Sequence, residues 1–318
     1  MNPKKWGSFL KTGDLIGVIA PSSPCDPNRL QSGLKALEGY GFKYKLSLDP
    51  AAAYGKDTFL FSSDTAKNRA DALRDLYLDN SIKAIIAARG AYGSMEMLPL
   101  IDFDAIKNNP KPLVGFSDVT ALLNVIFDRT GVATVHGSML TGAFAEISTD
   151  KDTDKDTDKD TEQSVLSLIE LLKGEELNPF KKVILEKLNA TSESSIEGVF
   201  KGGSLSVLSS LCGTPWMPNL DSAILFIEEV SEKPFRIHRM LMQLKLAGKL
   251  EQLKGVVFGE MLRCDHQSGP DVKKTITTIF ADYKYPVYWG LPVGHCALNL
   301  PLVVGGKGKI DQGRIELY

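Results

Sequence analysis

The sequence has few of the residues that build metal centres and disulfide frameworks. Its 318 residues include only four cysteines and four histidines, and no two cysteines form a CxxC pair. Scattered cysteines support neither a zinc site nor a disulfide framework, and they are typical of proteins that stay in a reducing compartment. We therefore expect a cytoplasmic protein that holds no metal.

Long apolar runs and a strong net charge are also missing. No segment approaches the roughly 20 apolar residues that a membrane-spanning helix needs, and the first seven residues lack the apolar core of a secretory signal. The net charge of −2, without a basic cluster, argues against a nucleic-acid partner. A lysine-rich amphipathic helix that would lie on a membrane is absent too. The sequence thus excludes nucleic acid and membranes as expected partners.

The first half of the chain alternates apolar runs with amphipathic helical patterns. Because buried parallel strands appear as continuous apolar runs, this alternation predicts a doubly wound, flavodoxin-like α/β domain over residues 1–148. The helical patterns lie at 26–41, at 64–78 and after Ser117. The predicted strands are residues 15–20, 42–46, 82–88, 113–116 and 132–135.

The second half opens with three copies of Thr-Asp-Lys-Asp at residues 149–160. The copies lack the glycine and the closing glutamate of a calcium-binding EF-hand loop, so we expect a solvated insertion. With a helix that starts near residue 165, it forms a linking segment over 149–175. Residues 176–318 predict a second α/β domain with a mixed or barrel-like sheet. Its strands are expected at 182–185, 196–200, 223–230, 256–261, 286–293 and 302–310, and its helices at 204–212, 234–247 and 270–283.

Several polar residues follow the predicted strands of the first domain. Ser22, the glycine-rich loop 89–93, Ser117 and His136 all come directly after a strand. Ligand sites of doubly wound sheets lie at the carboxyl ends of the strands. We therefore expect these residues to line one site.

Ser117 stands at an abrupt strand-to-helix turn. A serine there lies beside free backbone N–H groups, which can hold the oxyanion of an acyl-transfer reaction. The same position also suits a serine that caps the helix. The turn alone leaves both interpretations open.

The four histidines offer a short list of general bases. His238 and His266 have polar neighbours and are expected on the surface. His136 is a candidate for lining the site. His295 follows a glycine just past an apolar run, where it can transfer protons or serve as a hydrogen-bonded structural residue.

Glu228 and Glu229 end the apolar strand 223–230. A buried carboxylate needs a partner, which can be an imidazole that it orients. A salt bridge to Lys233 or Arg236 satisfies the same need. Strand alternation does not choose between the two glutamates.

Taken together, the motifs resemble those of the LD-carboxypeptidase family of serine peptidases. Gly-Phe-Ser-Asp-Val-Thr at 115–120 matches the nucleophile turn of that family, and Gly-Leu-Pro-Val-Gly-His at 290–295 matches its histidine loop. Similar stretches of the sequence lie at 13–24, 89–94, 202–205, 213–215, 227–230 and 234–241. The resemblance covers nearly the whole chain except the repeat.

This resemblance implies a role for each site residue. It implies Ser117 as nucleophile, His295 as general base and Glu228 as the acid that orients it. The oxyanion hole would use backbone amides, that of Asp118 and one in the Gly90–Ala91 loop. Alanine at position 91, where the family has glycine, is compatible if φ stays negative there. Ser204 and His238 are further departures, since the family tends to have Asn and Asp.

The implied reaction is removal of the terminal D-alanine from a muropeptide, by hydrolysis of its bond to lysine or diaminopimelate, in cell-wall recycling. The resemblance implies no organic cofactor. It also implies that the protein forms a homodimer. Arg89, Tyr92 and Arg236 lie beside site motifs and are candidates for contacting the substrate. One alternative is a related peptidase that hydrolyses a peptidyl- or aminoacyl-nucleotide antibiotic and confers immunity. The other is a non-catalytic ligand-binding protein.

Overall fold

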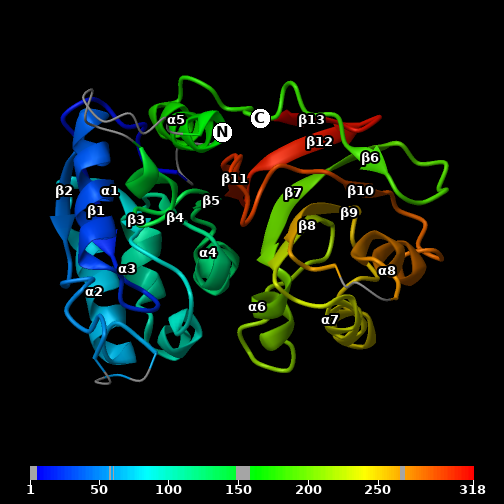
Figure 1. The fold of residues 1–318 in the computed structure, drawn as a ribbon, viewed down its shortest axis with the longest axis horizontal. Helices are drawn as coiled ribbons and strands as arrows, with labels where there is room; N and C mark the ends of the chain where they lie inside the picture. The colour runs from blue at the N-terminus through cyan, green and yellow to red at the C-terminus, as the bar shows by residue number, and fades with distance from the viewer. Residues whose placement is uncertain (1–5, 57–58, 60, 148–157, 266–268) are drawn as a thin grey trace.

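The computed structural model describes residues 6–56, 59, 61–147, 158–265 and 269–318. The expectations for the first five residues, for most of the Thr-Asp-Lys-Asp repeat and for His266 lie outside these ranges. Figure 1 shows the chain as two sheets, with β1 to β5 on one side and β7 to β10 on the other. Within the described part of the chain, no helix is both long and apolar enough to cross a membrane.

The first sheet confirms the predicted parallel, doubly wound domain. Its order is β11-β5-β4-β3-β1-β2, and β1 to β5 run parallel. Strands β2-β1-β3-β4-β5 follow the flavodoxin order, in which the chain switches direction across the sheet next to β1. The five parallel strands are β1 Leu15–Ile19, β2 Lys43–Leu46, β3 Ile82–Ala87, β4 Leu113–Gly115 and β5 Thr134–His136.

Helices cover both faces of this sheet. The apolar sides of α1 and α5 pack on one face, and those of α2, α3 and α4 pack on the other. Asp26 caps α1 through its side chain, and the first helical residue is Pro27, whose missing N–H costs nothing at that position. Their bounds are α1 Pro27–Gly39, α2 Ala66–Leu78, α3 Phe103–Asn108, α4 Thr120–Thr130 and α5 Lys159–Lys173, with short 3₁₀ turns η2 Ser94–Leu100, η3 Ser117–Val119 and η4 Ala143–Glu146.

The second sheet is mixed, as predicted. Its order is β13-β12-β7-β8-β9-β10-β6, with a parallel centre from β7 to β10 and antiparallel edges. Its strands are β6 Glu186–Lys187, β7 Ser195–Ser204, β8 Ala223–Val230, β9 Gly255–Leu262, β10 Val287–Trp289, β12 Lys307–Asp311 and β13 Arg314–Leu317. Helices α6 Leu205–Ser210, α7 Pro234–Leu246 and α8 Val272–Ile279 pack on one face.

The other face of the second sheet packs against the first half of the molecule. Along β8, Ile224 and Phe226 join the core that contains α4, whereas Leu225 and Ile227 pack against α6 to α8. Because side chains alternate along a strand, the next residue on the α4 side is Glu228. The fold therefore directs this carboxylate toward the nucleophile turn.

Several predicted elements of the second half are wrong in their extent. Residues 182–185 form no strand but a single bridge at Ile184, and the strand expected at 286–293 is limited to β10. Residues 302–310 do not form one strand: β11 Leu302–Val304 pairs antiparallel with β5 in the first sheet, and β12 pairs with β7 in the second. Gly305, with φ 90°, lies between them, and a Cβ there would collide with the ring of Phe127. The helix expected from residue 165 begins earlier, at Lys159.

Candidate active site

Ser117 lies in a sharp turn between β4 and η3. Its φ of 60° is left-handed, a conformation that costs a non-glycine residue energy and that is concentrated at functional sites. Gly115 makes the turn possible, because a Cβ there would lie 2.8 Å from Cγ1 of Val119. The Ser117 side chain does not cap α4, whose N-cap Val119 makes no side-chain bond. The interpretation of Ser117 as the helix cap is therefore not supported.

The hydroxyl of Ser117 instead faces His295. Oγ of Ser117 lies 3.1 Å from Nε2 of His295, and Nδ1 of the same ring lies 2.7 Å from Oε2 of Glu228. Since a carboxylate only accepts, Nδ1–H donates to Glu228 and Nε2 is left to accept from the hydroxyl. Gly294 allows this approach, because a Cβ there would lie 2.7 Å from Oε2 of Glu228. The structure thus joins a serine, a histidine and a glutamate from two sheets.

Glu229 has different partners. Its Oε2 accepts from the amide of Ser206 at 2.7 Å, and its Oε1 accepts from the amide of Val230 at 2.9 Å. Burial raises the pKa of Glu229 above its usual value. Arg236 pairs with Glu232, so it forms the predicted salt bridge with neither Glu228 nor Glu229. Of the two adjacent glutamates, Glu228 is the one that contacts an imidazole.

His295 is electrostatically coupled to Glu228. Burial by itself lowers the pKa of the imidazole, but the hydrogen bond and the negative charge of Glu228 outweigh burial, and the pKa is raised. The Glu228 side chain is fully buried, whereas the His295 side chain is 22% exposed. A base that is partly exposed and backed by a buried carboxylate can take a proton from Ser117 and hold it as an imidazolium.

The loop after β3 lies against the nucleophile. A Cβ built on Gly90 would lie 3.2 Å from Cβ of Ser117, so the backbone of this loop reaches the reacting atom closely. The condition set for alanine at position 91, a negative φ, is not met, because the φ of Ala91 is 81°. Ala91 therefore has a left-handed backbone conformation, which glycine adopts more easily than other residues, and Ser117 has such a conformation too.

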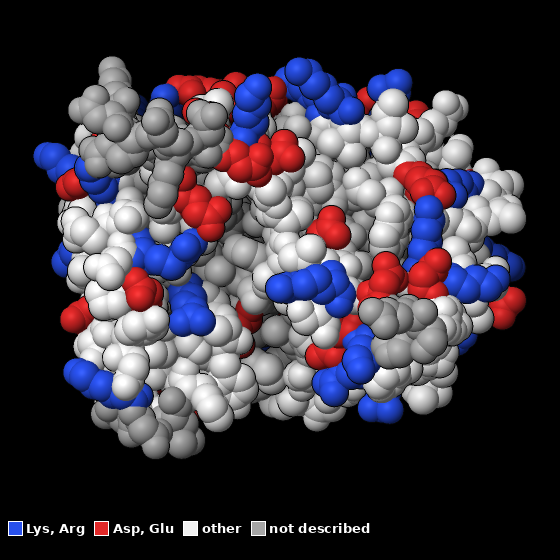
Figure 2. All heavy atoms as spheres, in the orientation of Figure 1, with Lys and Arg blue, Asp and Glu red and all other residues white. Residues whose placement is uncertain are grey.

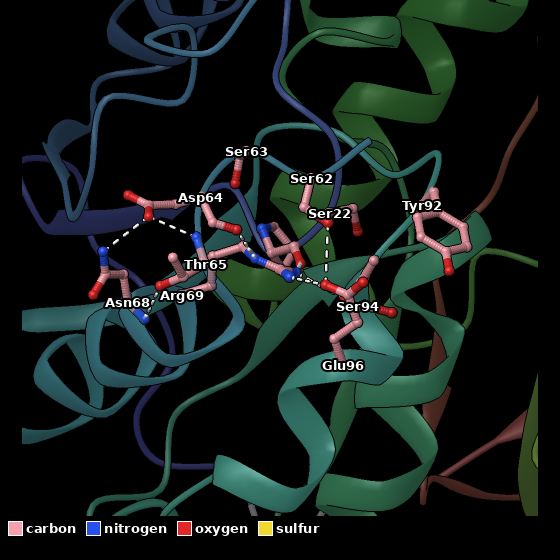
Figure 3. A network of polar contacts seen from close by, with 12 residues as sticks. Ser22, Ser62, Ser63, Asp64, Thr65, Asn68, Arg69, Tyr92, Ser94 and Glu96 are labelled. Atoms are coloured by element: carbon pink, nitrogen blue, oxygen red, sulfur yellow. Dashed lines mark hydrogen bonds and ion pairs between the residues drawn. The ribbon is translucent and has the colours of Figure 1, made fainter. Parts of the chain in front are cut away.

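A buried arginine ties the loops around the nucleophile together (Figure 3). Arg69 of α2 is fully buried. Its Nη1 donates to the carbonyls of Pro21 at 2.5 Å and Gly93 at 2.8 Å, its Nε donates to the carbonyl of Asp64 at 3.0 Å, and its Nη2 pairs with Glu96. The guanidinium thus fixes the start of the loop after β1 to the end of the loop after β3.

Sequence reasoning missed Arg69, although a signal was present. The residue stands on the apolar face of the helix next to Ala70 and Leu73, where an unpaired charge would be costly. An arginine in such a position needs several acceptors. Loop carbonyls provide most of them here.

The side chain of Asp118 anchors the nucleophile turn to both loops. Its Oδ2 accepts from the Ser22 hydroxyl at 2.6 Å and from the Ser94 amide at 2.8 Å, and its carbonyl accepts from Oγ of Ser94 at 2.6 Å. Ser22, predicted at the site from its strand end, therefore acts through Asp118. The amide of Asp118 stands in the first turn of η3, where backbone N–H groups have no partner within the helix.

Two polar side chains of α4 join the halves of the site. Nδ2 of Asn124 donates to the Gly202 carbonyl at 2.8 Å, and Oδ1 accepts from the Gly202 amide at 3.0 Å. Oγ1 of Thr120 accepts from the Ser204 amide at 3.1 Å. Only the backbone of Ser204 takes part in this contact, so serine in place of the family's asparagine leaves it intact. These bonds fix β7, the neighbour of β8, against the helix that follows Ser117.

A cavity of about 510 Å³ opens beside His295. Figure 2 shows the surface hollowed between the two halves, with basic and acidic side chains around the hollow. The lining comes from both halves of the chain. It comprises Phe116, Ser138, Gly142, Ala143, Glu146, Asp158, Thr161, Val230, Leu262, Arg263, Gly294, His295, Cys296, Ala297 and Asn299.

The three predicted substrate-contacting residues lie elsewhere. None of them is among the described residues that line this cavity. Arg89 donates to the carbonyl of Pro24 at 2.8 Å, Tyr92 is 54% exposed and packs edge-on against Phe61, and Arg236 lies on the outer side of α7. The arginine of the cavity is Arg263, which sequence reasoning missed because it stands in a polar loop without a motif.

His136, predicted to line the site, lies behind it instead. It is fully buried between Phe116 and Phe226, with ring centroids 5.6 and 5.3 Å away. Burial lowers the pKa of His136 to about 4, so its ring is neutral near pH 7. Its packing links the residue before Ser117 with the strand that carries Glu228. His238 is exposed on α7, as expected.

Comparison with known proteins decides the family. The models for the N-terminal and the C-terminal domain of LD-carboxypeptidases match residues 16–137 and 197–310. A probable murein peptide carboxypeptidase of Bacillus subtilis (strain 168) is 34% identical over 312 residues, which are 95% of this chain and 90% of the relative. The chain belongs to the LD-carboxypeptidase family. It is therefore a peptidase by family, an enzyme that hydrolyses its substrate.

Relatives within this family carry two kinds of name. A muramoyltetrapeptide carboxypeptidase from Oxalobacter formigenes superposes with a TM-score of 0.76 at 25% identity, over 95% of this chain and 97% of that one. The microcin C7 self-immunity protein MccF of Escherichia coli is 31% identical over 95% of this chain and 92% of its own length. MccF in complex with glutamyl sulfamoyl guanosine superposes with a TM-score of 0.82 at 25% identity, over 98% of each chain. The chain is thus similar to proteins of both groups.

Proposed function

We propose that this protein is a serine carboxypeptidase that hydrolyses the bond between the L-diamino acid and the terminal D-alanine of peptidoglycan tetrapeptides. The observation that carries the proposal is the hydrogen-bonded series Ser117–His295–Glu228 beside an open cavity. Murein and muramoyltetrapeptide carboxypeptidases among its relatives support this choice of substrate.

In the acylation step, Ser117 attacks the carbonyl carbon of the scissile bond while Nε2 of His295 takes the hydroxyl proton. The buried carboxylate of Glu228 stabilises the imidazolium that forms. The same proton then passes to the nitrogen of the leaving D-alanine, and the C–N bond breaks. In the second step, His295 takes a proton from a water molecule, and the water oxygen bonds to the acyl carbon. The bond from that carbon to Oγ of Ser117 then breaks, and His295 returns the proton to Oγ. The protein needs no other base for either half of the reaction.

The negative charge of the tetrahedral intermediate falls on the former carbonyl oxygen. We propose that the amide of Asp118 and an amide of the Gly90–Ala91 loop hold it. One such donor typically contributes about 3 kcal/mol to the transition state. The closeness of Gly90 to Ser117, the anchoring of Asp118 and the fixation of the loop by Arg69 all support this assignment. Amides held in this way need not reorganise during the reaction.

The alternative substrate is a peptidyl- or aminoacyl-nucleotide, which the same three residues could hydrolyse. A nucleobase would need an aromatic face on which to stack. Among the described residues that line the cavity, the aromatic side chains are His295 and Phe116. The Phe116 ring already packs against His136 and against His295, with a distance of 5.0 Å between the ring centroids of Phe116 and His295. The cavity therefore favours the peptide substrate.

The test is to incubate wild type and Ser117→Ala with a muramoyl tetrapeptide and to follow D-alanine by mass spectrometry. We expect release by the wild type and none by the variant. An aminoacyl-nucleotide analogue, run in parallel, tests the alternative substrate. Wild type that releases no D-alanine but cleaves the nucleotide analogue would establish the alternative. Binding without cleavage of either compound would point to a non-catalytic protein.

We further propose that the enzyme works in the cytoplasm and as a homodimer. All four cysteines are free in the structure, which supports a reducing compartment. The homodimer rests on the family resemblance alone. Sedimentation velocity at micromolar concentration tests it, and a single species of 34.7 kDa would contradict it.

A further inference from the structure

The reaction places the leaving residue next to His295. Nε2 must deliver its proton to the leaving nitrogen, so that nitrogen lies within hydrogen-bonding reach of the imidazole. In an amino acid the carboxylate carbon is about 2.5 Å from the nitrogen, one Cα away. The carboxylate of the departing residue therefore lies close to His295 and inside the same cavity. A carboxypeptidase needs a cation there to distinguish a chain end from a chain interior.

Among the described residues that line this cavity, Arg263 is the one with a positively charged side chain. Arg263 directly follows β9, which runs parallel to β8, the strand that carries Glu228. Arg263 therefore lies at the same carboxyl ends of the strands as Glu228. Its positive charge acts on His295, where it opposes the effect of Glu228. Arg263 thus lines the same cavity as His295, the residue next to which the leaving residue must lie.

The guanidinium of Arg263 has no carboxylate partner within the described part of the chain. Its backbone φ is 55°, a left-handed conformation that non-glycine residues adopt at a cost and often at functional sites. A planar guanidinium can bind both oxygens of a carboxylate at once. The residue thus has the charge and the planar geometry to bind a terminal carboxylate.

Other charged groups near the cavity are less suited. Arg29 is occupied by Glu146 at 2.9 Å and by the carbonyl of Thr141 at 2.7 Å. Glu146 and Asp158 line the cavity and would repel a carboxylate. The charge distribution therefore leaves Arg263 as the anion-binding group.

We propose that Arg263 binds the carboxylate of the departing C-terminal residue and so restricts the enzyme to chain ends. The inference rests on the proposed function and names the specificity residue of that same site. It predicts that Arg263 contributes to selectivity and not to bond cleavage itself. Substrates without the charge should gain nothing from the arginine.

The test uses a tetrapeptide with a free terminal carboxylate and the same peptide with a terminal carboxamide. For wild type we expect kcat/KM to be about 100-fold higher for the acid than for the amide. Arg263→Gln should lower kcat/KM for the acid by a similar factor and leave the value for the amide within about threefold, since the two changes remove the same interaction. Arg263→Lys should retain part of the preference, because it keeps the charge without the fork.

Comparator variants make the result specific. Arg89→Gln and Arg236→Gln remove the arginines suggested by the sequence, and Arg314→Gln removes an exposed arginine on β13. All three should keep the wild-type preference for the acid. An unchanged preference in Arg263→Gln, or a loss in Arg89→Gln or Arg236→Gln, would overturn the inference. Asn tolerates the left-handed backbone better than Gln, so Arg263→Asn repeats the test if Arg263→Gln misfolds. Wild type that cleaves neither peptide would overturn the proposed function and this inference with it.

Discussion

The two halves of the active site are positioned by different means. In the nucleophile half the backbone carries the geometry: Ser117 and Ala91 have φ of 60° and 81°, and Arg69 holds the loop carbonyls. In the acid–base half, which consists of His295 and Glu228, the geometry depends on one side-chain hydrogen bond, 2.7 Å from Nδ1 of His295 to Oε2 of Glu228. Changes in the first half should therefore alter stability and rate together, whereas changes in the second should alter mainly the rate.

The largest effect is expected where the two halves meet. Ser117→Ala removes the nucleophile and should lower kcat by about 10⁶, because the members of such a triad act as a unit. His295→Ala should lower kcat by a similar factor, and the double variant should be little worse than either single one. D-alanine release measures each rate. Ser210→Ala, an exposed serine of α6, is the control. If the loss in the double variant approached the product of the two single losses, the two residues would act independently.

A smaller effect is expected from the orienting acid. Glu228→Gln should lower kcat/KM by about 10⁴, as loss of the acid does in other serine triads. Glu229→Gln is the matched control: it lies next in sequence, contacts the amides of Ser206 and Val230, and should change kcat/KM by less than about tenfold. Equal losses in the two variants would mean that Glu228 has no special relation to His295.

The pH profile tests the same pair in another way. Because Glu228 raises the pKa of His295, the base is neutral only at higher pH, and the acid limb of kcat/KM should lie above the ordinary value of about 6.5. Glu228→Gln removes the charge and leaves burial, which lowers the pKa, so the acid limb should move to lower pH. An acid limb that stays in place would contradict this coupling.

A moderate effect on both rate and stability is expected in the nucleophile half. Arg69→Met removes the side-chain donor to the carbonyls of Pro21 and Gly93, and it should lower the free energy of unfolding by about 2–4 kcal/mol. The loosened loop should lower kcat by about 10–100-fold, with a smaller change in KM. Urea unfolding and D-alanine release measure the two quantities. Arg74→Met changes a half-buried arginine on the same helix that pairs with Asp71 and Asp75, and it should alter both quantities much less.

The smallest effect is expected at Ala91. Ala91→Gly relieves the left-handed backbone but adds freedom to the unfolded chain, so the free energy of unfolding should rise by at most about 1 kcal/mol. Activity should stay within about threefold, because only the backbone is proposed to act. The opposite change, Gly93→Ala, should destabilise the protein, since its Cβ would lie 2.4 Å from Oγ of Ser62. A destabilised Ala91→Gly would show that the turn is not strained.

Apolar periodicity was enough to predict the first sheet, because β1, β3 and β4 are buried on both faces and continuous in sequence. It failed at residues 302–310, where a turn at Gly305 sends two halves of one apolar run into different sheets. The register of β8 was not predictable either, since alternation places Glu228 and Glu229 on opposite faces without saying which face meets the nucleophile.

The residues that carry chemistry were predictable where they stand in motifs. Ser117, His295 and Glu228 each lie in a recognisable stretch, and the structure brings them into contact. Arg69 and Arg263 were missed because their roles come from contacts distant in sequence: with loop carbonyls for Arg69, and with the shared cavity for Arg263. The positive φ of Ala91 was not predictable, because its backbone is set by the surrounding loops and not by its own preference.

The most direct test of the account is labelling with a fluorophosphonate, which reacts with activated serines whatever the natural substrate. Intact-protein and peptide mass spectrometry should find one adduct, on Ser117, formed at least about 10³-fold more slowly in His295→Ala. Glu228→Gln should also slow the reaction. An adduct on another serine, or an unchanged rate in His295→Ala, would contradict the claim that the two halves activate Ser117 together.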